Sequence, residues 1–567
     1  MHHRRTILAN AMAMALILHA QAAEVPPPRL DVELTPKAHS GKVDAVQVKL
    51  RVEAPGVAAG QMLLRMPLVV VGIPTAAYSA EAITVNDAAG PLTLRGVDEA
   101  PTPTATYRQY LADRATVGDV SVSYVGTPRQ VNAQTPPGPF FDLRTEGDGL
   151  LGAGVYFLAL PPEDRPYRIG MTWRLEGLPT GTRGIWSLGE GEQHTVGPTQ
   201  TLAYSIYATG PVKSEPEDGK GDFGLYWLTT SPFDMRALAK DTRALYRYMA
   251  KFFNDEQASY RIFARRNPYP AGGGNALEKS FIFGYGGAGE SAVGGDQLLL
   301  AHEMAHNWPR LDDNEDNVET AWYTEGTAEF YSSALALRAG VIDLDKFITL
   351  VNGRAAEYAG NPFKSLSNSE VGKLFWKDAR AQRLPYGRGF MYLARVDAQL
   401  RAATRGARSL DDLVLEMYAR RVAGKKAGLA QWRGLVRRNL GANGIADFEA
   451  MVAGKDIVPP ANTFGPCLKP VFYQLRPFDV GFYGMSSGVV QELRPDSAAA
   501  AAGIQNGDKI LSSPALLKAA QQREDAVLVL DLLRGEQAMK ISYVPRRPQV
   551  AAWRWERAPA AKGGCKL

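Results

Sequence analysis

Hydrophobic and polar residues alternate along the first third of the chain. In segments 46–52 and 169–175 the apolar residues stand at every second position. This spacing predicts strands that bury one face. Runs rich in Gly and Pro, such as 135–139, separate the strands. We therefore expect residues 24–226 to form an all-β domain.

The period becomes helical near residue 231. Ser231 precedes Pro232 and stands three residues before Asp234, an order that predicts a helix start with Ser231 as the N-cap. Apolar residues then recur every three to four positions up to Phe252. Helical patterns continue to residue 458, interrupted by a β-like stretch at 260–285. Residues 227–458 should form a mainly α domain with a small sheet.

A Pro-rich linker at 459–466 leads into a third pattern of short strands around one short helix. Ser497 precedes the run 498–502, and Gly503 follows it, which predicts a capped helix. We expect residues 468–548 to form a small α+β domain. Residues 549–567 are expected to be a tail, flexible from Ala558 onwards.

The first 23 residues have the pattern of a secretory signal peptide. Arg4 and Arg5 precede an apolar run at 7–18, and small residues at 20–22 offer a cleavage site. The run is too short for a membrane span, and no later stretch is long and apolar enough for one. The sequence thus predicts export, most simply to the periplasm, and no integral membrane segment after signal removal.

Composition narrows the class of protein only slightly. With 45% hydrophobic and 22% charged residues among 567, the chain is expected to fold into several globular domains. A net charge of +5 gives no basis for nucleic-acid binding. An oxidising compartment favours a disulfide between Cys467 and Cys565, the chain's two cysteines, over two separate buried thiols.

The clearest chemical signal is the segment 301–308. His302 and His306 are four residues apart, so a helix places both imidazoles on one face, where they can bind a single metal ion. Glu303 points beside that ion and can accept a proton from its water. The sequence contains only seven histidines, three of them within the predicted signal peptide. A chance occurrence of this pattern is therefore improbable.

A catalytic zinc site needs a third protein ligand, and no histidine follows His306. The ligand must therefore be a carboxylate. Glu325, 19 positions after the second histidine, is the preferred candidate, and Glu319 is the alternative. Glu329 lies one helical turn beyond Glu325 and could hold a ligating imidazole by its other N–H.

A donor for the oxyanion of a tetrahedral intermediate should lie near such a site. The absence of further histidines leaves Tyr or Arg for this role. The segment 385–390 contains both types of residue among glycines that permit close backbone approach. A purely packing role for Tyr386 is the alternative.

Together these segments resemble the gluzincin metallopeptidases of the glycyl aminopeptidase type. Residues 302–308 match the zinc helix of that family, 322–326 its third-ligand segment, and 386–389 its Tyr-x-Lys-Gly block, with Arg388 in place of Lys. The resemblance implies an N-terminal β domain, a thermolysin-like catalytic domain and a C-terminal PDZ domain. It also implies one Zn²⁺ as cofactor and a transition-state role for Tyr386.

The same family carries a Gly-Gly and Glu segment on the strand that receives substrate. Here Gly273 and Gly274 are separated from Glu278 by additional residues. The resemblance implies that Glu278 receives the substrate's N-terminal ammonium, and the alternative is a solvated loop acid. With Glu278 in that role the enzyme is an aminopeptidase for N-terminal Gly or Ala; without it, endopeptidase action remains open.

The C-terminal segments 481–482, 488–490 and 507–511 are similar to those of PDZ domains. Such a domain adds an extended peptide to a sheet edge and receives its terminal carboxylate, or it merely supports the catalytic domain. A PDZ-led binding protein with an idle peptidase domain is the second alternative function. An idle domain would be expected to have lost Glu303 or a ligand, and the sequence retains them all.

Overall fold

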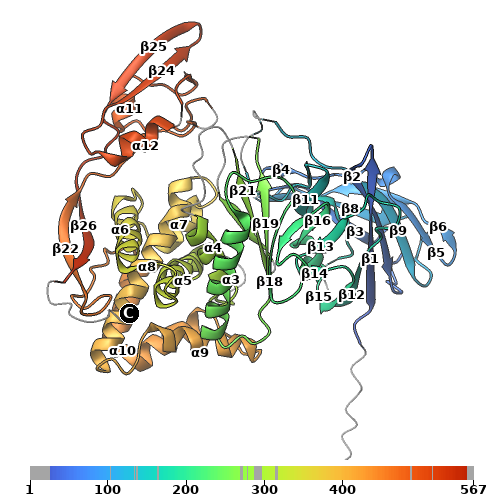
Figure 1. Ribbon diagram of the computed structural model, residues 1–567, viewed down its shortest axis with the longest axis horizontal. Helices are drawn as coiled ribbons and strands as arrows, with labels where there is room; N and C mark the ends of the chain where they lie inside the picture. Colours follow the sequence, from blue (N-terminus) through green and yellow to red (C-terminus); the bar gives the residue numbers. More distant parts are fainter. Residues whose placement is uncertain are drawn as a thin grey trace, which may run out of the picture.

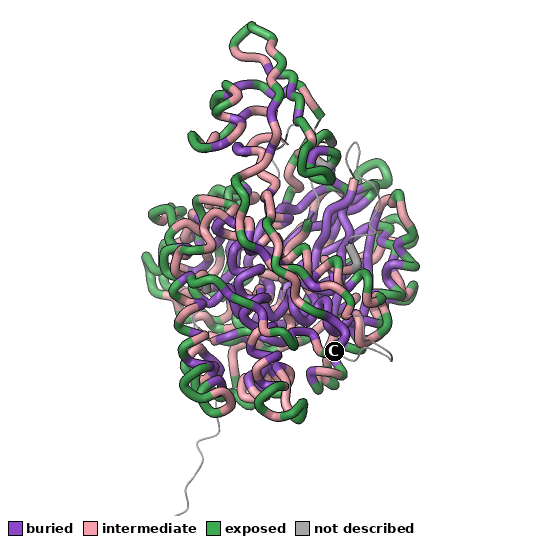
Figure 2. The backbone as a smooth tube through the Cα atoms, turned by 90° about the vertical axis from the view of Figure 1, so that its left-hand side faces the viewer, coloured by how far each residue is buried: buried purple, intermediate pink, exposed green. Residues whose placement is uncertain are grey.

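The computed structural model divides into a β-rich part, a helical part and a small C-terminal unit (Figure 1). It describes residues 26–558, except for 103, 133–134, 136–137, 163–164, 269–272, 278, 287–295, 313–316, 486–487 and 514. The predicted signal peptide therefore lies outside the described residues, as do Glu278 and Cys565. The C-terminal unit projects from the body, and the buried residues concentrate in the body itself (Figure 2).

The N-terminal part consists of three sheets, which confirms the all-β prediction. The seven-stranded sheet has the order β15-β12-β1-β2-β9-β5-β6: β15 (Gln193–Gly197), β12 (Tyr167–Trp173), β1 (Arg29–His39), β2 (Lys42–Val52), β9 (Val120–Gly126), β5 (Thr84–Asp87) and β6 (Gly90–Pro91). The four-stranded sheet comprises β4 (Ile73–Pro74), β3 (Met62–Val70), β8 (Ala105–Ala112) and β7 (Leu94–Asp98). The five-stranded sheet comprises β10 (Arg144–Glu146), β11 (Gly149–Ala153), β16 (Ile206–Gly210), β13 (Arg183–Trp186) and β14 (Gly189–Glu190). Three short helices connect these strands: η1 (Ala80–Ala82), α1 (Gly154–Phe157) and α2 (Gln200–Ala203).

A second five-stranded sheet begins the helical part of the chain. Its order is β17-β18-β19-β21-β20, with β18, β19 and β21 parallel: β17 (Lys213–Glu215), β18 (Phe223–Trp227), β19 (Tyr260–Arg266), β21 (Ser280–Tyr285) and β20 (Gly274–Leu277). The predicted domain boundary at 226/227 is wrong, because it cuts β18. That strand carries no alternation, since a parallel strand buried on both faces reads as a continuous apolar run.

Both faces of this second sheet are covered. Phe263 and Ile282 pack against the N-terminal five-stranded sheet in one cluster. Ile262, Phe281 and Phe283 face the opposite side and join the core of the helices. The sheet therefore fixes the helical part to the β-rich part.

Eight helices of the described residues follow or flank the sheet in the helical part: α3 (Met235–Phe252), α4 (Asp296–Ala305), α5 (Asn317–Arg338), α6 (Leu344–Gly360), α7 (Asn368–Leu374), α8 (Ala379–Ala403), α9 (Leu410–Val422) and α10 (Leu429–Val452). The predicted N-cap Ser231 is wrong, because the Asp234 side chain accepts from the N–H groups of Arg236 and Ala237 and caps α3 instead. An aspartate caps as well as a serine does, so local pattern could not separate the two. None of these helices is both long and apolar enough to cross a membrane.

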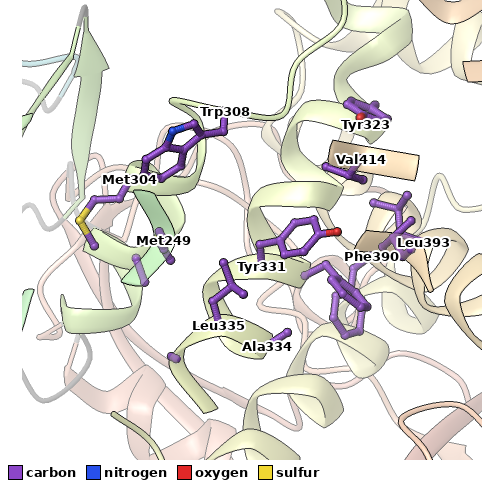
Figure 3. Close-up of a cluster of buried hydrophobic side chains, with 14 of the residues drawn as sticks. Met249, Met304, Trp308, Tyr323, Tyr331, Ala334, Leu335, Phe390, Leu393 and Val414 are labelled. Carbon is purple, nitrogen blue, oxygen red and sulfur yellow. The ribbon is translucent and has the colours of Figure 1, made fainter. Parts of the chain in front are cut away.

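The helical core is aromatic and continuous. Figure 3 shows Met304 and Trp308 from the metal-motif segment beside Met249 of α3, with Tyr331 of α5 and Phe390 of α8 next to them. All five side chains are buried. This packing fixes α4 against α3 on one side, and α5 against α8 on the other.

A two-stranded ribbon leads from the helical part to the C-terminal unit. It pairs β22 (Leu468–Leu475) with β26 (Val550–Arg557) in antiparallel register. The predicted tail at 549–567 is therefore wrong over 550–557, because these residues form β26. The predicted unit at 468–548 is wrong over 468–475, because these residues form β22 of the ribbon. Trp555 of β26 is fully buried in the helical core, and its backbone exchanges two hydrogen bonds with Asn352 of α6, at 2.6 and 3.0 Å. The short apolar pattern around Trp555 gave no sign of its distant partner.

The C-terminal unit has a core of its own. Its three-stranded sheet comprises β23 (Lys509–Ile510), β24 (Leu528–Arg534) and β25 (Gln537–Tyr543), with α11 (Ala498–Ala501) and α12 (Ala515–Gln522) beside it. Ser497 caps α11 as predicted. At the base of the ribbon Cys467 is buried and disulfide-bonded, while Cys565, its predicted partner, is not among the described residues.

Replacing Trp555 by Ala should destabilise the helical part, because it empties a large site in the helical core. We expect the free energy of unfolding to fall by about 3–5 kcal/mol. Trp553 of the same strand, which is only partly buried and contacts Phe472 across the ribbon, is the control, and Trp553→Ala should cost about 1 kcal/mol. Denaturant unfolding followed by circular dichroism measures both; equal losses would contradict the role of Trp555 as an anchor.

Candidate metal centre

Helix α4 and the turn after it present the two histidines. Leu300, Ala301 and Met304 are fully buried on the core side of α4. The opposite side therefore carries His302 and Glu303. Beyond Ala305 the chain keeps turning, as the N–H groups of Asn307 and Trp308 donate to carbonyls three residues back. This turn brings His306 beside His302.

The third predicted ligand, Glu325, comes from α5. Its Oε2 lies 3.2 Å from His302 Nε2 and 3.6 Å from His306 Nε2, and the two Nε2 atoms are 3.2 Å apart. A tetrahedral zinc ion bound at about 2.1 Å separates its ligand atoms by about 3.4 Å. The three donor atoms therefore stand at the corners of one face of such a tetrahedron.

The surroundings of these atoms fit a cation. Glu325 Oε2 is buried and has no hydrogen-bond partner among the described residues. A buried carboxylate oxygen in that state needs a positive partner. Glu319, the alternative ligand, is exposed on the first turn of α5 and does not belong to the group formed by His302, His306 and Glu325. Two imidazoles and one carboxylate suit zinc better than a harder ion.

Glu329 lies behind His302, as the helical spacing predicts. Its Oε1 is 3.2 Å from His302 Nδ1, the nitrogen that faces away from Glu325. Its other oxygen contacts Arg354 of α6. Sequence reasoning missed Arg354, because no local motif marks an arginine that joins the site from a separate helix.

Glu303 faces the same cleft as His306 and Tyr386. Burial raises the pKa of its carboxyl to about 7. The charge of His302 lowers this pKa, and the charge of Glu325 raises it. A carboxylate with such a pKa can take and return a proton near neutral pH.

Tyr386 of α8 lies over the metal-binding group. Its ring stacks on that of His302, with centroids 5.6 Å apart and an interplanar angle of 11°. Burial, followed by the charges of Glu325 and Glu303, raises the pKa of its hydroxyl well above the ordinary value. The hydroxyl therefore stays protonated at neutral pH and can donate a hydrogen bond.

Arg388 occupies the position of the resembled family's lysine but does not face the cleft. It is almost fully buried and donates to Asn368 Oδ1 at 2.5 Å and to the carbonyls of Lys364 and Leu366 at 2.9 and 2.6 Å. Its role is to fix α7 and the preceding turn against α8.

A cleft of about 800 Å³ runs from these residues to the edge strand β20, and Gly274 to Leu277 form part of its wall. Among the described residues β20 pairs only with β21, which leaves its other edge open in this part of the chain. Gly273 has a φ of +89°, a conformation suited to glycine, and a Cβ on Gly274 would overlap the ring of Phe281. Both glycines are therefore structural requirements of the strand. Glu278 follows β20 directly and lies outside the described residues.

Comparison with solved structures identifies the fold. The crystal structure of an aminopeptidase N family protein from Idiomarina loihiensis superimposes with a TM-score of 0.62, covering 92% of this chain and 97% of the other at 15% identity. The chain has the fold of that protein. An M1 zinc metallopeptidase mutant from Deinococcus radiodurans bound to Tyr-Ser-Ala (TM-score 0.45, 18% identity, 77% and 95% covered) and leukotriene A4 hydrolase from Saccharomyces cerevisiae (0.46, 15%, 77% and 68%) are also similar. No family model and no curated protein matches the sequence.

Zinc binding should release a proton from His302. Burial lowers the pKa of its imidazole, but the neighbouring carboxylates of Glu325 and Glu329 outweigh burial and raise it to about 10. Metal binding requires the neutral imidazole, so the apparent affinity should rise about tenfold per pH unit from pH 7 to 9. Competition with a chromophoric chelator measures this slope. Burial lowers the pKa of His306 to about 4, so this residue is already neutral and releases no proton when zinc binds. A pH-independent zinc affinity would show that His302 is neutral as well, against the prediction.

Proposed function

We propose that this protein is a zinc-dependent aminopeptidase that removes N-terminal residues, preferably Gly or Ala, from peptides. The observation that carries the proposal is the tetrahedral spacing of His302, His306 and Glu325 beside an open edge strand. The fold shared with the Idiomarina protein, which is described as an aminopeptidase N family protein, supports it. The retention of Glu303 and Tyr386 in the cleft argues against an idle peptidase domain.

In this mechanism His302, His306 and Glu325 would hold one Zn²⁺, which would supply Lewis-acid chemistry to polarise the scissile carbonyl and acidify water. Glu303 takes the proton of the attacking water and passes it to the leaving amine. The Tyr386 hydroxyl donates a hydrogen bond to the oxyanion as it forms. Glu329 keeps the His302 ring oriented through the contact of its Oε1 with Nδ1, at 3.2 Å.

The substrate would lie extended along β20. Its backbone would pair with the open edge of that strand, which is how extended peptides commonly add to sheets. Glu278, immediately after Leu277, would bind the N-terminal ammonium and so limit cleavage to the first residue. This assignment rests on the family resemblance and on the position of Glu278 next to the edge strand.

The C-terminal unit offers a second, separate edge. Tyr483 exchanges two backbone hydrogen bonds with Gln491, so the N–H and C=O of Phe482 point the other way. Among the described residues, neither the N–H nor the C=O of Phe482 has a hydrogen-bond partner. We propose that this edge can take a peptide C-terminus. We also propose that the first 23 residues direct the export of the enzyme to the periplasm.

Replacing Glu303 by Gln should abolish turnover and leave zinc bound. Glutamine has nearly the same shape but cannot take the proton from water, so kcat should fall by about 10³-fold or more. Steady-state kinetics and zinc quantification on the same preparation test both halves. Retention of most of the wild-type rate would contradict the role of Glu303.

Free-amine substrates distinguish exopeptidase from endopeptidase action. The purified zinc-loaded protein should hydrolyse Gly- and Ala-para-nitroanilide, leave their N-acetylated forms intact, and lose activity with a chelator, because only a free ammonium can pair with Glu278. Cleavage of longer blocked peptides alone would indicate an endopeptidase. Inactivity on every peptide despite bound zinc would favour peptide binding by the C-terminal unit.

A further inference from the structure

An unbroken chain of ion pairs runs behind the metal centre. Arg354 of α6 contacts Glu329 Oε2 through Nε and donates from Nη1 to Glu357 Oε2 at 3.0 Å. Glu357 Oε1 accepts from Arg383 Nε of α8 at 2.9 Å. The Arg383 guanidinium in turn lies 5.1 Å from the ring centroid of Tyr386. The chain therefore ends on one side at His302, through Glu329, and on the other at Tyr386.

The linked side chains of Glu329, Arg354, Glu357 and Arg383 are called the brace below, and their chemistry suits that role. Glu329 has a side chain only 6% exposed, so without Arg354 it would be a buried charge with one imidazole as its partner. The planar guanidinium of Arg354 can address two carboxylates in a fixed fork, which a lysine cannot do. Arg383 meets the electron-rich face of the Tyr386 ring while its Nε stays paired.

We propose that Arg354 and Arg383, joined through Glu357, are positioning residues that hold His302 and Tyr386 in one fixed relation. The inference extends the proposed function, since it assigns residues that orient a metal ligand and the oxyanion donor. Neither arginine lines the metal cleft. Both act through the groups that they touch.

The brace also connects the metal centre to the C-terminal ribbon. Arg354, Glu357 and Arg383 line a groove of about 850 Å³ whose other wall is formed by the C-terminal unit, including the segment 479–483. Asn352, two residues before Arg354, holds the backbone of Trp555. The position of α6, and with it that of Arg354, therefore depends on β26.

Four variants of the full-length chain test the proposal: Arg354→Gln, Arg354→Lys, Arg383→Gln and the matched control Arg395→Gln. Arg395 pairs with Asp447 and is about as buried as Arg354. Like Arg383 it lies on α8, but away from the site. Three quantities are measured for each variant. These are zinc affinity by chelator competition, the absorption spectrum of the cobalt(II)-substituted protein, and kcat with KM on Ala-para-nitroanilide.

Arg354→Gln should weaken zinc binding by about 10- to 100-fold and alter the cobalt spectrum, because His302 loses its fixed orientation. Arg383→Gln should lower kcat by about tenfold and leave KM, zinc affinity and the spectrum unchanged, because Tyr386 acts on the transition state. Arg395→Gln should match the wild type in every measurement.

Wild-type zinc affinity and spectrum in Arg354→Gln would overturn the brace at His302, and wild-type kcat in Arg383→Gln would overturn it at Tyr386. If Arg354→Gln does not fold, Arg354→Lys decides, because it keeps a charge beside Glu329 but lacks the planar fork that holds both carboxylates in fixed geometry. Its zinc affinity should fall several-fold, and an unchanged value would overturn the proposal. Were the wild type to bind zinc without cleaving peptides, the proposed function would fail, while affinity and spectrum would still test the brace at His302.

Discussion

The close crossing of α5 and α8 is the constraint on which the site depends. A Cβ on Gly326 would lie 2.5 Å from the Cα of Gly389, and one on Gly389 would overlap the carbonyl of Trp322. Only glycine fits at both positions, so the two backbones touch. Glu325 immediately precedes the first glycine, and Tyr386 lies one turn before the second. The contact between helices therefore brings the candidate metal ligand Glu325 and the proposed oxyanion donor Tyr386 together.

The parallel strands supply the rigid support for that crossing. Because β19 and β21 are buried on both faces, the sheet is held between the N-terminal β layers and the helices. Trp308 continues this support beyond the metal motif. It stacks on Phe253 at 5.0 Å and donates its indole N–H to Asp255. The histidines thus stand between a rigid sheet and a packed aromatic core, which favours preorganised ligands.

Much of this arrangement was predictable from local pattern. The all-β first part, the helical middle with its small sheet and the capped helix after Ser497 each follow from a periodicity or a capping rule. The positions that failed are those where two remote segments meet. β18 reads as a plain apolar run because both of its faces are covered. The sequence of β26 resembles a tail because its buried partner, α6, lies about two hundred residues earlier.

The sequence by itself determined the chemistry of the candidate site. His302, Glu303 and His306 lie within one helical turn of one another, and the lack of later histidines forces a carboxylate as third ligand. Such inferences need only helix geometry and residue type. Tertiary structure alone decided that Glu325 rather than Glu319 completes the group, that Arg388 serves packing, and that Arg354 reaches Glu329. Those outcomes depend on how helices cross, and crossing is set by contacts between residues that no local pattern connects.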